Sequence, residues 1–339
     1  MRPITYARAG TPGEAVRMGT IDGPSRVTAS MQFLAGGTQV LDLTKLDVMR
    51  PERLVDITRI ADPRMTSIEA TAQGLRLGAL VTMRQAAEHP AVMGDYPVVS
   101  ESLWKGASQQ IRNMGRLGGN LLQRTRCSYF RDTSYGACNK REPGSGCAAL
   151  GGVNRIHAVL GVTDKCIASY PGDFAQALIA LDGMVELLGP AGARVIPFSQ
   201  LHLQRADAPD IETTLQPGEL IVAMIIPAGP HTRRSTYVKV RDRESYAFAL
   251  ASAAVALDLG DDGVVRDARI GLGGIHYAPY RATAAEDELR GKLLDEESAT
   301  AAAGAAMAGS VTHGHNDYKP ELARRTLVRA LLQAKDMRV

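Results

Sequence analysis

Short apolar runs separated by turn residues occupy the first part of the chain. Met31–Ala35 leads into Gly36-Gly37-Thr38-Gln39, and Leu54–Ile57 is a second run of strand length. Thr11-Pro12-Gly13-Glu14 has the pattern of a capping box with proline at the first helical position. The opening therefore predicts the order strand–helix–strand, with another helix beginning at about Val40.

The next segments alternate between strand and helix patterns. Gly74–Leu80 has strand character, and Thr82 can cap a helix that runs to about His89 and ends at Pro90. Residues Tyr96–Ala107 have helical spacing. Together these patterns predict strands and helices in this part of the chain.

Regular patterns return after a long aperiodic segment. Asp173–Leu181 predicts a helix, Gly189-Pro190-Ala191-Gly192 predicts a hairpin turn, and Leu220–Ile226 predicts a strongly apolar strand. Pro227-Ala228-Gly229-Pro230 has the composition of a linker, so we expect a domain boundary there.

Residues beyond this linker predict strands followed by helices. Tyr237–Val240, Phe248–Leu259 and Val264–Leu272 have strand patterns, and the turn at Gly260–Gly263 predicts a hairpin. From Glu286 to about Lys335 the chain is rich in Ala and Leu with helical spacing. This order is typical of an α+β unit.

Composition limits the class of protein. With 339 residues, 45% hydrophobic and 22% charged, the chain fits a soluble globular protein of two or three compact units. No apolar run approaches the roughly 20 residues of a membrane span, and a net charge of +3 is too small to favour nucleic acid. The N-terminus lacks the pattern of a secretory signal. We therefore expect a cytoplasmic protein, or a periplasmic one exported with a partner that carries the signal.

Positive charge is concentrated between Lys105 and Arg141, where eight basic side chains accompany one acidic one, Asp132. Such a run is either a solvated basic face or the surroundings of an anionic ligand. Two glycine-rich segments favour the second interpretation, because in Phe33–Val40 and Arg116–Asn120 backbone N–H groups can converge on a phosphate. Neither segment matches a standard nucleotide-binding fingerprint, and each alone is also consistent with a tight turn.

The periodic pattern fails between Leu122 and Ala168, and this segment holds all four cysteines of the chain: Cys127, Cys138, Cys147 and Cys166. Their spacing, C-x10-C-x8-C-x18-C, fits neither a zinc ribbon nor a ferredoxin pattern. A metal site, unrelated buried thiols and disulfides all remain open. Four thiolates suit zinc or a [4Fe–4S] cluster, and either would order a loop that we expect to have little core of its own.

Including the two glycine-rich segments, six motifs are spread along the chain: Phe33–Val40, Gln110–Asn113, Leu117–Asn120, Tyr170–Asp173, Pro217–Ile221 and Lys239–Arg243. Together they resemble the FAD-binding subunit of the xanthine dehydrogenase and carbon monoxide dehydrogenase family. The resemblance implies an α+β fold, with a two-part FAD-binding domain of the vanillyl-alcohol-oxidase (PCMH) type at residues 1–228. A Cys-rich insertion would occupy about 122–168, and a smaller α+β domain of the CO dehydrogenase flavoprotein type would occupy 231–339.

The family pattern also implies which residues hold FAD. The two glycine loops would contact the pyrophosphate and ribityl chain, and three residues further along would contact other parts of the cofactor. Arg116 stands where the family usually has Ser or Thr, so a cation replaces a small hydroxyl donor there. The implied set is Phe33, Leu34, Ala35, Gly36, Gly37, Thr38, Gln39, Val40, Arg116, Leu117, Gly118, Gly119, Asn120, Asp173, Ile221 and Lys239.

The residues around the cysteines give a narrower resemblance. Leu121–Cys127, Cys138–Arg141, Pro143–Leu150 and Cys166–Ala168 are similar to the flavin subunit of bacterial periplasmic aldehyde oxidoreductase, which carries a [4Fe–4S] cluster in an insertion. The resemblance implies that all four cysteines ligate one such cluster, with zinc as the alternative.

The same resemblance implies an electron-transfer subunit. A large partner subunit would hold the molybdenum cofactor and the aldehyde site, and a small one would hold [2Fe–2S] clusters. This chain would pass electrons from those clusters through FAD to an external acceptor, and no acid–base catalytic residue is expected because the redox chemistry belongs to the cofactor. Two alternatives are a stand-alone flavin reductase on the same fold and a non-catalytic, zinc-stapled assembly subunit without FAD.

Two other groups of residues are interpreted as structural. His313 and His315 lie in a polar turn without a third ligand, which favours a solvated loop over a metal site. Trp104 and Tyr96 share a helical stretch and are interpreted as core or interface side chains rather than groups that stack on a flavin.

Overall fold

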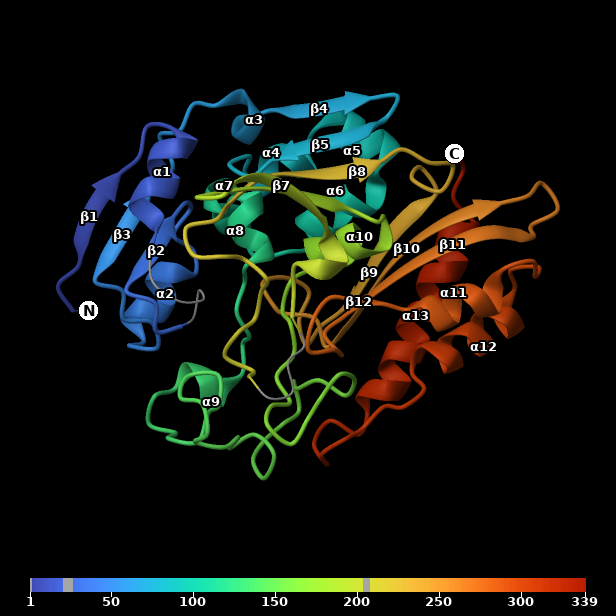
Figure 1. Cartoon of the computed structure of the whole chain (residues 1–339). Helices are drawn as coiled ribbons and strands as arrows, with labels where there is room; N and C mark the ends of the chain where they lie inside the picture. The colour runs from blue at the N-terminus through green and yellow to red at the C-terminus, as the bar shows by residue number, and fades with distance from the viewer. Residues whose placement is uncertain (1, 21–26, 204–207) are drawn as a thin grey trace.

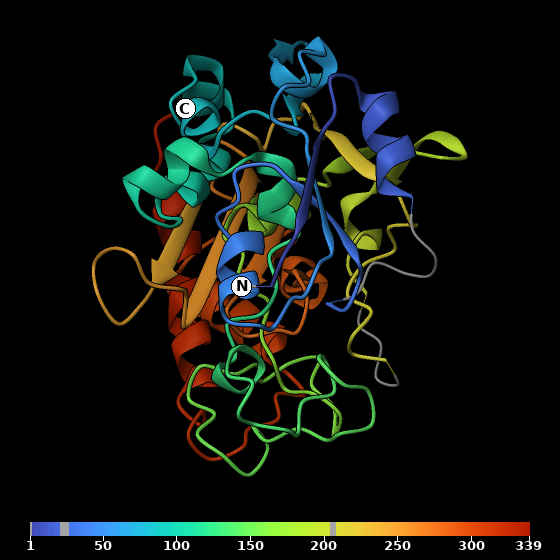
Figure 2. The same cartoon turned by 90° about the vertical axis from the view of Figure 1, so that its left-hand side faces the viewer.

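Three β-sheets organise the computed structural model, which describes residues 2–20, 27–203 and 208–339. A small sheet with the N-terminal helices lies at one end, a five-stranded sheet lies in the middle, and a four-stranded sheet with the C-terminal helices lies at the other end (Figure 1). The cysteine-rich segment forms loops below these layers in both Figure 1 and Figure 2.

The N-terminal sheet is parallel, with the strand order β1–β3–β2. Its elements are β1 Thr5–Arg8, α1 Pro12–Gly19, β2 Met31–Leu34, α2 Val40–Lys45 and β3 Arg53–Asp56. Thr11 caps α1 as predicted, because its hydroxyl accepts a hydrogen bond from the Glu14 N–H at 3.2 Å. The Glu14 carboxylate, however, accepts from the Gly10 N–H at 2.8 Å, so the reciprocal half of the predicted capping box does not form.

The middle sheet is antiparallel, with the order β4–β5–β8–β6–β7. Its strands and adjoining short helices are α3 Pro63–Thr66, β4 Ile68–Thr71, β5 Gly74–Gly78, β6 Met184–Gly189, β7 Gly192–Pro197, η1 Phe198–Gln200 and β8 Leu220–Pro227. The hairpin predicted at Gly189–Gly192 is confirmed as the turn between β6 and β7. Strand β8 enters between β5 and β6, so neighbours in this sheet are far apart in the sequence.

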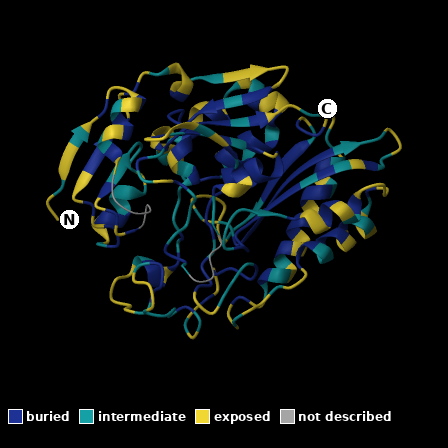
Figure 3. Ribbon diagram, viewed as in Figure 1, coloured by how far each residue is buried: buried dark blue, intermediate teal, exposed yellow. Residues whose placement is uncertain are grey.

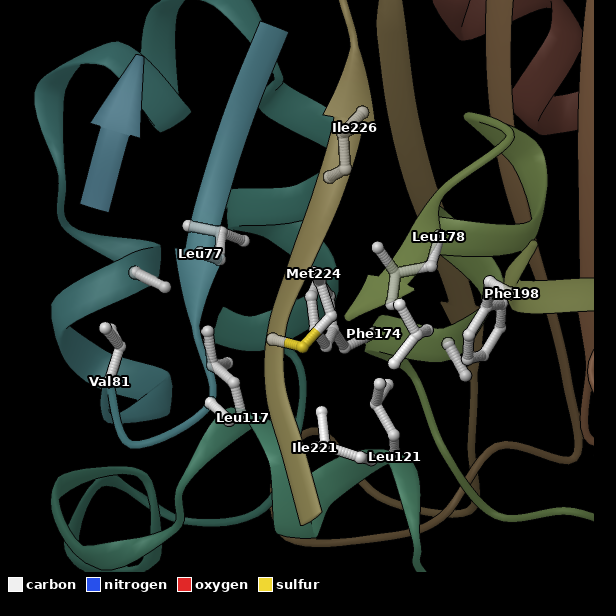
Figure 4. Packing of buried hydrophobic residues seen from close by; sticks show 14 of the residues in the cluster. Leu77, Val81, Leu117, Leu121, Phe174, Leu178, Phe198, Ile221, Met224 and Ile226 are labelled. Atoms are coloured by element: carbon white, nitrogen blue, oxygen red, sulfur yellow. The ribbon is translucent and has the colours of Figure 1, made fainter. Parts of the chain in front are cut away.

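Helices pack on the middle sheet around the main hydrophobic core. They are α4 Met83–Ala87, α5 Pro90–Asp95, α6 Pro97–Trp104, α7 Gln109–Met114, α8 Leu117–Leu121 and α10 Phe174–Ala180. Leu117 and Leu121 of α8 point into this core beside Phe174 and Met224 (Figure 4). The second glycine-rich segment is therefore a short helix rather than an open loop, and Pro90 begins a new helix as well as following one.

The C-terminal sheet is antiparallel, with the order β12–β11–β10–β9. Its elements are β9 Ser235–Val240, β10 Ala251–Leu259, β11 Val265–Gly273, β12 Tyr280–Arg281, α11 Thr283–Leu289, α12 Glu296–Ala306 and α13 Lys319–Lys335. The predicted start of a strand at Phe248 is wrong, because β10 begins at Ala251. The helical spacing predicted after Glu286 is divided among three helices, with Gly291 and Gly309 at positive φ after the first two.

The cysteine-rich segment contains one regular element, the short helix α9 Ser128–Arg131, as its lack of periodicity predicts. Its two ends lie close together, since the Tyr170 hydroxyl donates to the Leu121 carbonyl at 2.9 Å. The expectation that the loop has little core of its own is wrong. Phe130 and Ile167 are fully buried in a separate hydrophobic cluster, and Figure 3 shows further buried positions along these loops.

The first two sheets and the C-terminal sheet are joined by a common core. Tyr237, Ala254 and Ala256 come from β9 and β10 but are buried in the same cluster as the helices of the middle sheet. Within the part of the chain that the structure describes, no helix is both long and apolar enough to cross a membrane.

Candidate cofactor site

A cavity of about 800 Å³ lies between the N-terminal sheet, α8, the base of the cysteine-rich segment and the β9–β10 loop. We call it the flavin cavity. Most of the predicted FAD residues line it: Phe33, Ala35, Gly36, Gly37, Thr38, Gln39, Val40, Arg116, Gly118, Gly119, Asn120, Asp173, Ile221 and Lys239. Leu34 and Leu117 do not, and Leu117 is fully buried in the main core. This volume is typical of small-molecule and cofactor sites.

The two glycine segments differ in what their glycines do. A Cβ on Gly36 would lie 2.1 Å from the Met114 carbonyl oxygen, and Gly37 has a φ of +70°. Glycine is therefore required at Gly36 by the close approach of the Met114 backbone, and it is favoured at Gly37 by the positive φ of the turn. A Cβ on Gly119 would meet nothing within 4 Å. The absence of a side chain at Gly119 leaves room in the cavity, as the close approach of a cofactor requires.

Asn120 and Arg116 flank this glycine. Within the described ranges, the Asn120 side-chain oxygen is buried and has no hydrogen-bond partner. An unpaired buried acceptor on a cavity wall fits a ligand that donates a hydrogen bond there. Arg116 donates instead to the Leu80 carbonyl at 2.8 Å, so its guanidinium is engaged with the protein backbone.

Asp173 and Lys239 form an ion pair in the cavity wall, with 2.8 Å between Oδ2 and Nζ. The Tyr237 hydroxyl donates to the other oxygen of Asp173 at 2.6 Å. Burial and the Asp173 charge both raise the pKa of Tyr237, so the phenol stays protonated and acts as a donor. The sequence predicts each charged residue as a cofactor contact but gives no sign that they pair with each other.

Lys140 is a cavity residue that the sequence prediction missed. Its side chain is 5% exposed, and its ammonium donates to Glu212 at 2.7 Å, to the Tyr277 hydroxyl at 2.8 Å and to the Pro209 carbonyl at 3.1 Å. Burial alone would lower the pKa of Lys140, but Glu212 together with Tyr277 and Cys166 outweighs burial, so the pKa is raised. Glu212 also pairs with Arg124, another lining residue. The signal for these residues is the basic run around the cysteines.

Arg126 and Arg131 account for more of the basic run. Both reach Asp42 on α2, at 3.5 Å and 2.8 Å, and the Arg126 guanidinium lies over the Phe248 ring at 4.7 Å. Burial, together with the charge of Arg131, lowers the pKa of Arg126 to about 10. All four residues line the flavin cavity. This part of the basic run therefore lines a cavity and does not form a solvated face. Such a place agrees with the interpretation that the basic residues surround an anionic ligand.

The four cysteines converge on a second, small cavity that all of them line. Cys127, Cys138 and Cys166 are buried, Cys147 is partly buried, and all four are free thiols, so the disulfide alternative is not realised. Cys138 and Cys147 face each other in an antiparallel bridge. Four cysteines spread over a 40-residue window are thus brought to one place, as a shared ligand set requires.

Asn139 and Arg141 organise this loop. The Asn139 side chain accepts from Gly144 N–H and Gly146 N–H, each at 3.0 Å, and donates to the Lys165 carbonyl at 2.8 Å. The Arg141 guanidinium donates to backbone carbonyls of the α9 region, among them that of Phe130 at 2.9 Å. These hydrogen bonds from side chains to the backbone therefore cross-link the loop.

His157 adds a polar contact to the thiols, since its Nε2 lies 3.1 Å from the Cys127 sulfur. Burial raises the pKa of Cys127 to about 12 and that of Cys166 to about 11, so a metal would have to displace protons from them. Among the described residues no group of three or more His, Cys, Asp or Glu is placed to hold a metal ion. The convergence of the four thiols on one cavity leaves zinc and a [4Fe–4S] cluster as the alternatives.

None of the residues interpreted as structural lines either cavity. His315 is exposed in the turn before α13, and His313 is partly exposed beside it. Tyr96 is buried in the main core, and Trp104 is 40% exposed with Arg112 over its ring at 4.8 Å. Neither aromatic residue lines the flavin cavity.

Residues 2–229 match the model of the FAD binding domain in molybdopterin dehydrogenase, and residues 236–334 match that of the CO dehydrogenase flavoprotein C-terminal domain. The chain therefore belongs to the family of FAD-binding subunits of molybdopterin dehydrogenases, the xanthine and carbon monoxide dehydrogenase family. It is a subunit of an oxidoreductase, and the fold class predicted from the sequence is confirmed.

Individual relatives agree with this assignment. The chain is 43% identical to the aldehyde oxidoreductase FAD-binding subunit PaoB of Escherichia coli (strain K12), covering 99% of each chain. It is 26% identical to the carbon monoxide dehydrogenase medium chain of Hydrogenophaga pseudoflava, covering 94% of this chain and 92% of that one. The structure is also similar to a chain of the Cu,Mo-CO dehydrogenase crystal structure, with a TM-score of 0.74, 26% identity and 99% of each chain covered.

Proposed function

We propose that the chain carries FAD and a [4Fe–4S] cluster and transfers electrons within a heteromeric molybdenum-dependent aldehyde oxidoreductase. The observation that carries the proposal is the convergence of four free cysteines directly beside the flavin cavity. Full-length similarity to an aldehyde oxidoreductase subunit supports aldehyde as the substrate class. The partners would be a large molybdenum-cofactor subunit and a small [2Fe–2S] subunit, with an external electron acceptor.

The residues of the flavin cavity divide the work of holding FAD. The backbone at Gly36-Gly37 and at Gly118-Gly119 would approach the pyrophosphate, and the unpaired Asn120 oxygen would accept a hydrogen bond. The Asp173–Lys239 pair would fix the polar atoms of the cofactor, and Ile221 would pack against an apolar part of it. FAD supplies the one- and two-electron chemistry, while these residues bind and orient it.

The proposal extends to domains and location. We assign residues 1–228 to the FAD-binding domain with its Cys-rich insertion at about 122–168, and residues 231–339 to the C-terminal domain. The family matches fall on either side of this boundary, which supports the division. Location in the periplasm with a signal-bearing partner, or in the cytoplasm, follows from the resemblance alone.

Substitution of Gly119 tests the FAD site. A Cβ on Gly119 meets nothing in the protein, so Gly119→Val should fold but place a side chain in the cavity and yield protein without flavin. Gly304→Val is the matched control, because Gly304 is also a helical glycine whose Cβ would meet nothing and it lies outside the cavity. Flavin absorbance per protein measures occupancy, and full occupancy in folded Gly119→Val would refute the placement.

Metal analysis tests the cluster. Anaerobically prepared protein should contain about four irons and matching acid-labile sulfide per FAD, as a [4Fe–4S] assignment requires. Changing any one of Cys127, Cys138, Cys147 or Cys166 to Ser should remove the iron and leave the flavin. Zinc in place of iron, or iron retained in every variant, would overturn the cluster and leave the FAD assignment intact.

A further inference from the structure

Two residues form the partition between the flavin cavity and the four-cysteine cavity. Across residues 2–20, 27–203 and 208–339, Lys140 and Ala168 are the ones that line both cavities. Ala168 contributes only a methyl group, so Lys140 is the charged group of the partition. It stands two positions after Cys138, and Ala168 stands two positions after Cys166.

The Lys140 ammonium is held in a fixed place. It donates to the Glu212 carboxylate, the Tyr277 hydroxyl and the Pro209 carbonyl, at 2.7, 2.8 and 3.1 Å. Glu212 and Tyr277 line the flavin cavity but not the cysteine cavity. The head of the side chain is therefore anchored on the flavin side, while its backbone belongs to the cysteine loop.

The charges of this group do not cancel. Among the described residues, Glu212 pairs with both Lys140 and Arg124, so within this group of three one carboxylate faces two cations and one positive charge is left over. A charge in a poorly solvated place acts on its neighbours far more strongly than a charge in water. The 5% exposure of Lys140 places the excess charge in such surroundings.

We propose that the single ammonium of Lys140 raises the reduction potentials of both the flavin and the [4Fe–4S] cluster. This inference rests on the proposed function, because it needs FAD in one cavity and the cluster in the other. An electron gained by either site makes that site more negative, less any proton taken up with it, and a fixed cation beside the site stabilises the added negative charge. Because one group shifts both reduction potentials in the same direction, the difference between them changes less than either potential alone.

Redox titration of the purified flavin- and cluster-loaded protein tests the inference, with absorbance and electron paramagnetic resonance as readouts. In Lys140→Met each of the two midpoint potentials should fall by at least about 59 mV. This corresponds to a tenfold decrease in the equilibrium constant for one-electron reduction. Lys140→Arg should restore them. Glu212→Gln should move the flavin potential the opposite way, because it removes the neutralising anion and leaves Lys140 in place. A merely structural disturbance would not give opposite signs.

The outcomes separate the two proposals. Wild-type protein that binds no cluster defeats both the inference and the proposed cluster. Wild-type protein with both cofactors, but with Lys140→Met potentials unchanged or shifted at only one site, defeats the inference alone. If Lys140→Met does not fold, Glu212→Gln still decides, and a fall or no change in its flavin potential overturns the inference.

Discussion

At Asp173 the sequence motif and the structure assign different partners to the same carboxylate. The motif predicts a contact with the cofactor, whereas the structure pairs Asp173 with Lys239 and Tyr237. The two assignments are compatible, because a carboxylate has about four acceptor positions and these neighbours occupy two of them. Asp173 therefore combines a structural role with its proposed cofactor role.

Asp173→Asn keeps the size of the side chain and removes its charge. Lys239, whose side chain is 2% exposed, would then be a buried cation without its partner, which costs about 3–5 kcal/mol. We expect the free energy of unfolding to fall by about that amount and FAD affinity to weaken tenfold or more. Asp242→Asn breaks an exposed pair with Arg155 and should change stability by at most about 1 kcal/mol. Flavin affinity unchanged in Asp173→Asn would remove Asp173 from the site.

His202 gives a pH-dependent prediction. Burial lowers its pKa to about 4, so the unfolded chain takes up a proton near pH 6.5 that the folded protein refuses until about pH 4. Stability is therefore lost as the pH falls through this window. The free energy of unfolding of His202→Phe minus that of wild type should therefore be about 2 kcal/mol larger at pH 5 than at pH 7.5. Denaturant titrations at both pH values measure this difference, with the exposed His315→Gln variant as control. The same pH dependence of stability in the two variants would refute the prediction.

Elements with strong local signals were predictable from the sequence, and those set by tertiary packing were not. Thr82 forms its capping box with Gln85, and Gly189–Gly192 makes its turn, because both depend on neighbouring residues. Leu117–Leu121 was not expected to be helical, since two glycines oppose it and burial of the flanking leucines decides it. Phe248 is apolar but 45% exposed on the β9–β10 loop, so hydrophobicity alone misplaced the start of a strand.

Helix α13 anchors the cysteine-rich segment through its first residue. The fully buried Lys319 ammonium donates to the Ile156 carbonyl at 3.2 Å, to the His157 carbonyl at 3.0 Å and to the Gly274 carbonyl. Lys319→Met would leave the His157 and Gly274 carbonyls without this donor, at a cost of about 1–3 kcal/mol, whereas the Ile156 carbonyl also accepts from the Ser169 hydroxyl at 3.2 Å. We expect faster loss of iron with flavin retained, whereas Arg329→Met, on the exposed face of the same helix, should behave as wild type. Equal iron loss in both variants would contradict this role.

On the scale of the whole molecule, the two family matches do not correspond to two independent cores. The main core takes Tyr237, Ala254 and Ala256 from beyond the linker, and the flavin cavity takes Lys239 from there. We therefore expect residues 1–229 expressed alone to be aggregation-prone and free of flavin, and co-expression of residues 230–339 to restore binding. A soluble, flavin-loaded fragment would show that the shared core is dispensable.

Contacts between segments that are far apart in the sequence limit what can be predicted from the sequence. Strand β8 lies between β5 and β6, and the flavin cavity draws on segments from the N-terminal sheet to the β9–β10 loop. Such long-range pairings leave no local pattern, so the candidate cofactor residues came from family motifs. Lys140 and Glu212 were missed because their partnership exists only after folding brings them together.

The cysteine-rich segment leaves the body of the protein and returns to it at nearly the same point, where Tyr170 meets Leu121. A chain lacking this excursion could be closed there by a short turn without moving α8 or α10. Such a shortened relative would lose two of the three acceptors of Lys319 and keep only the Gly274 carbonyl. Gain or loss of the excursion in evolution should therefore be accompanied by an exchange at position 319, from lysine to an apolar residue or the reverse.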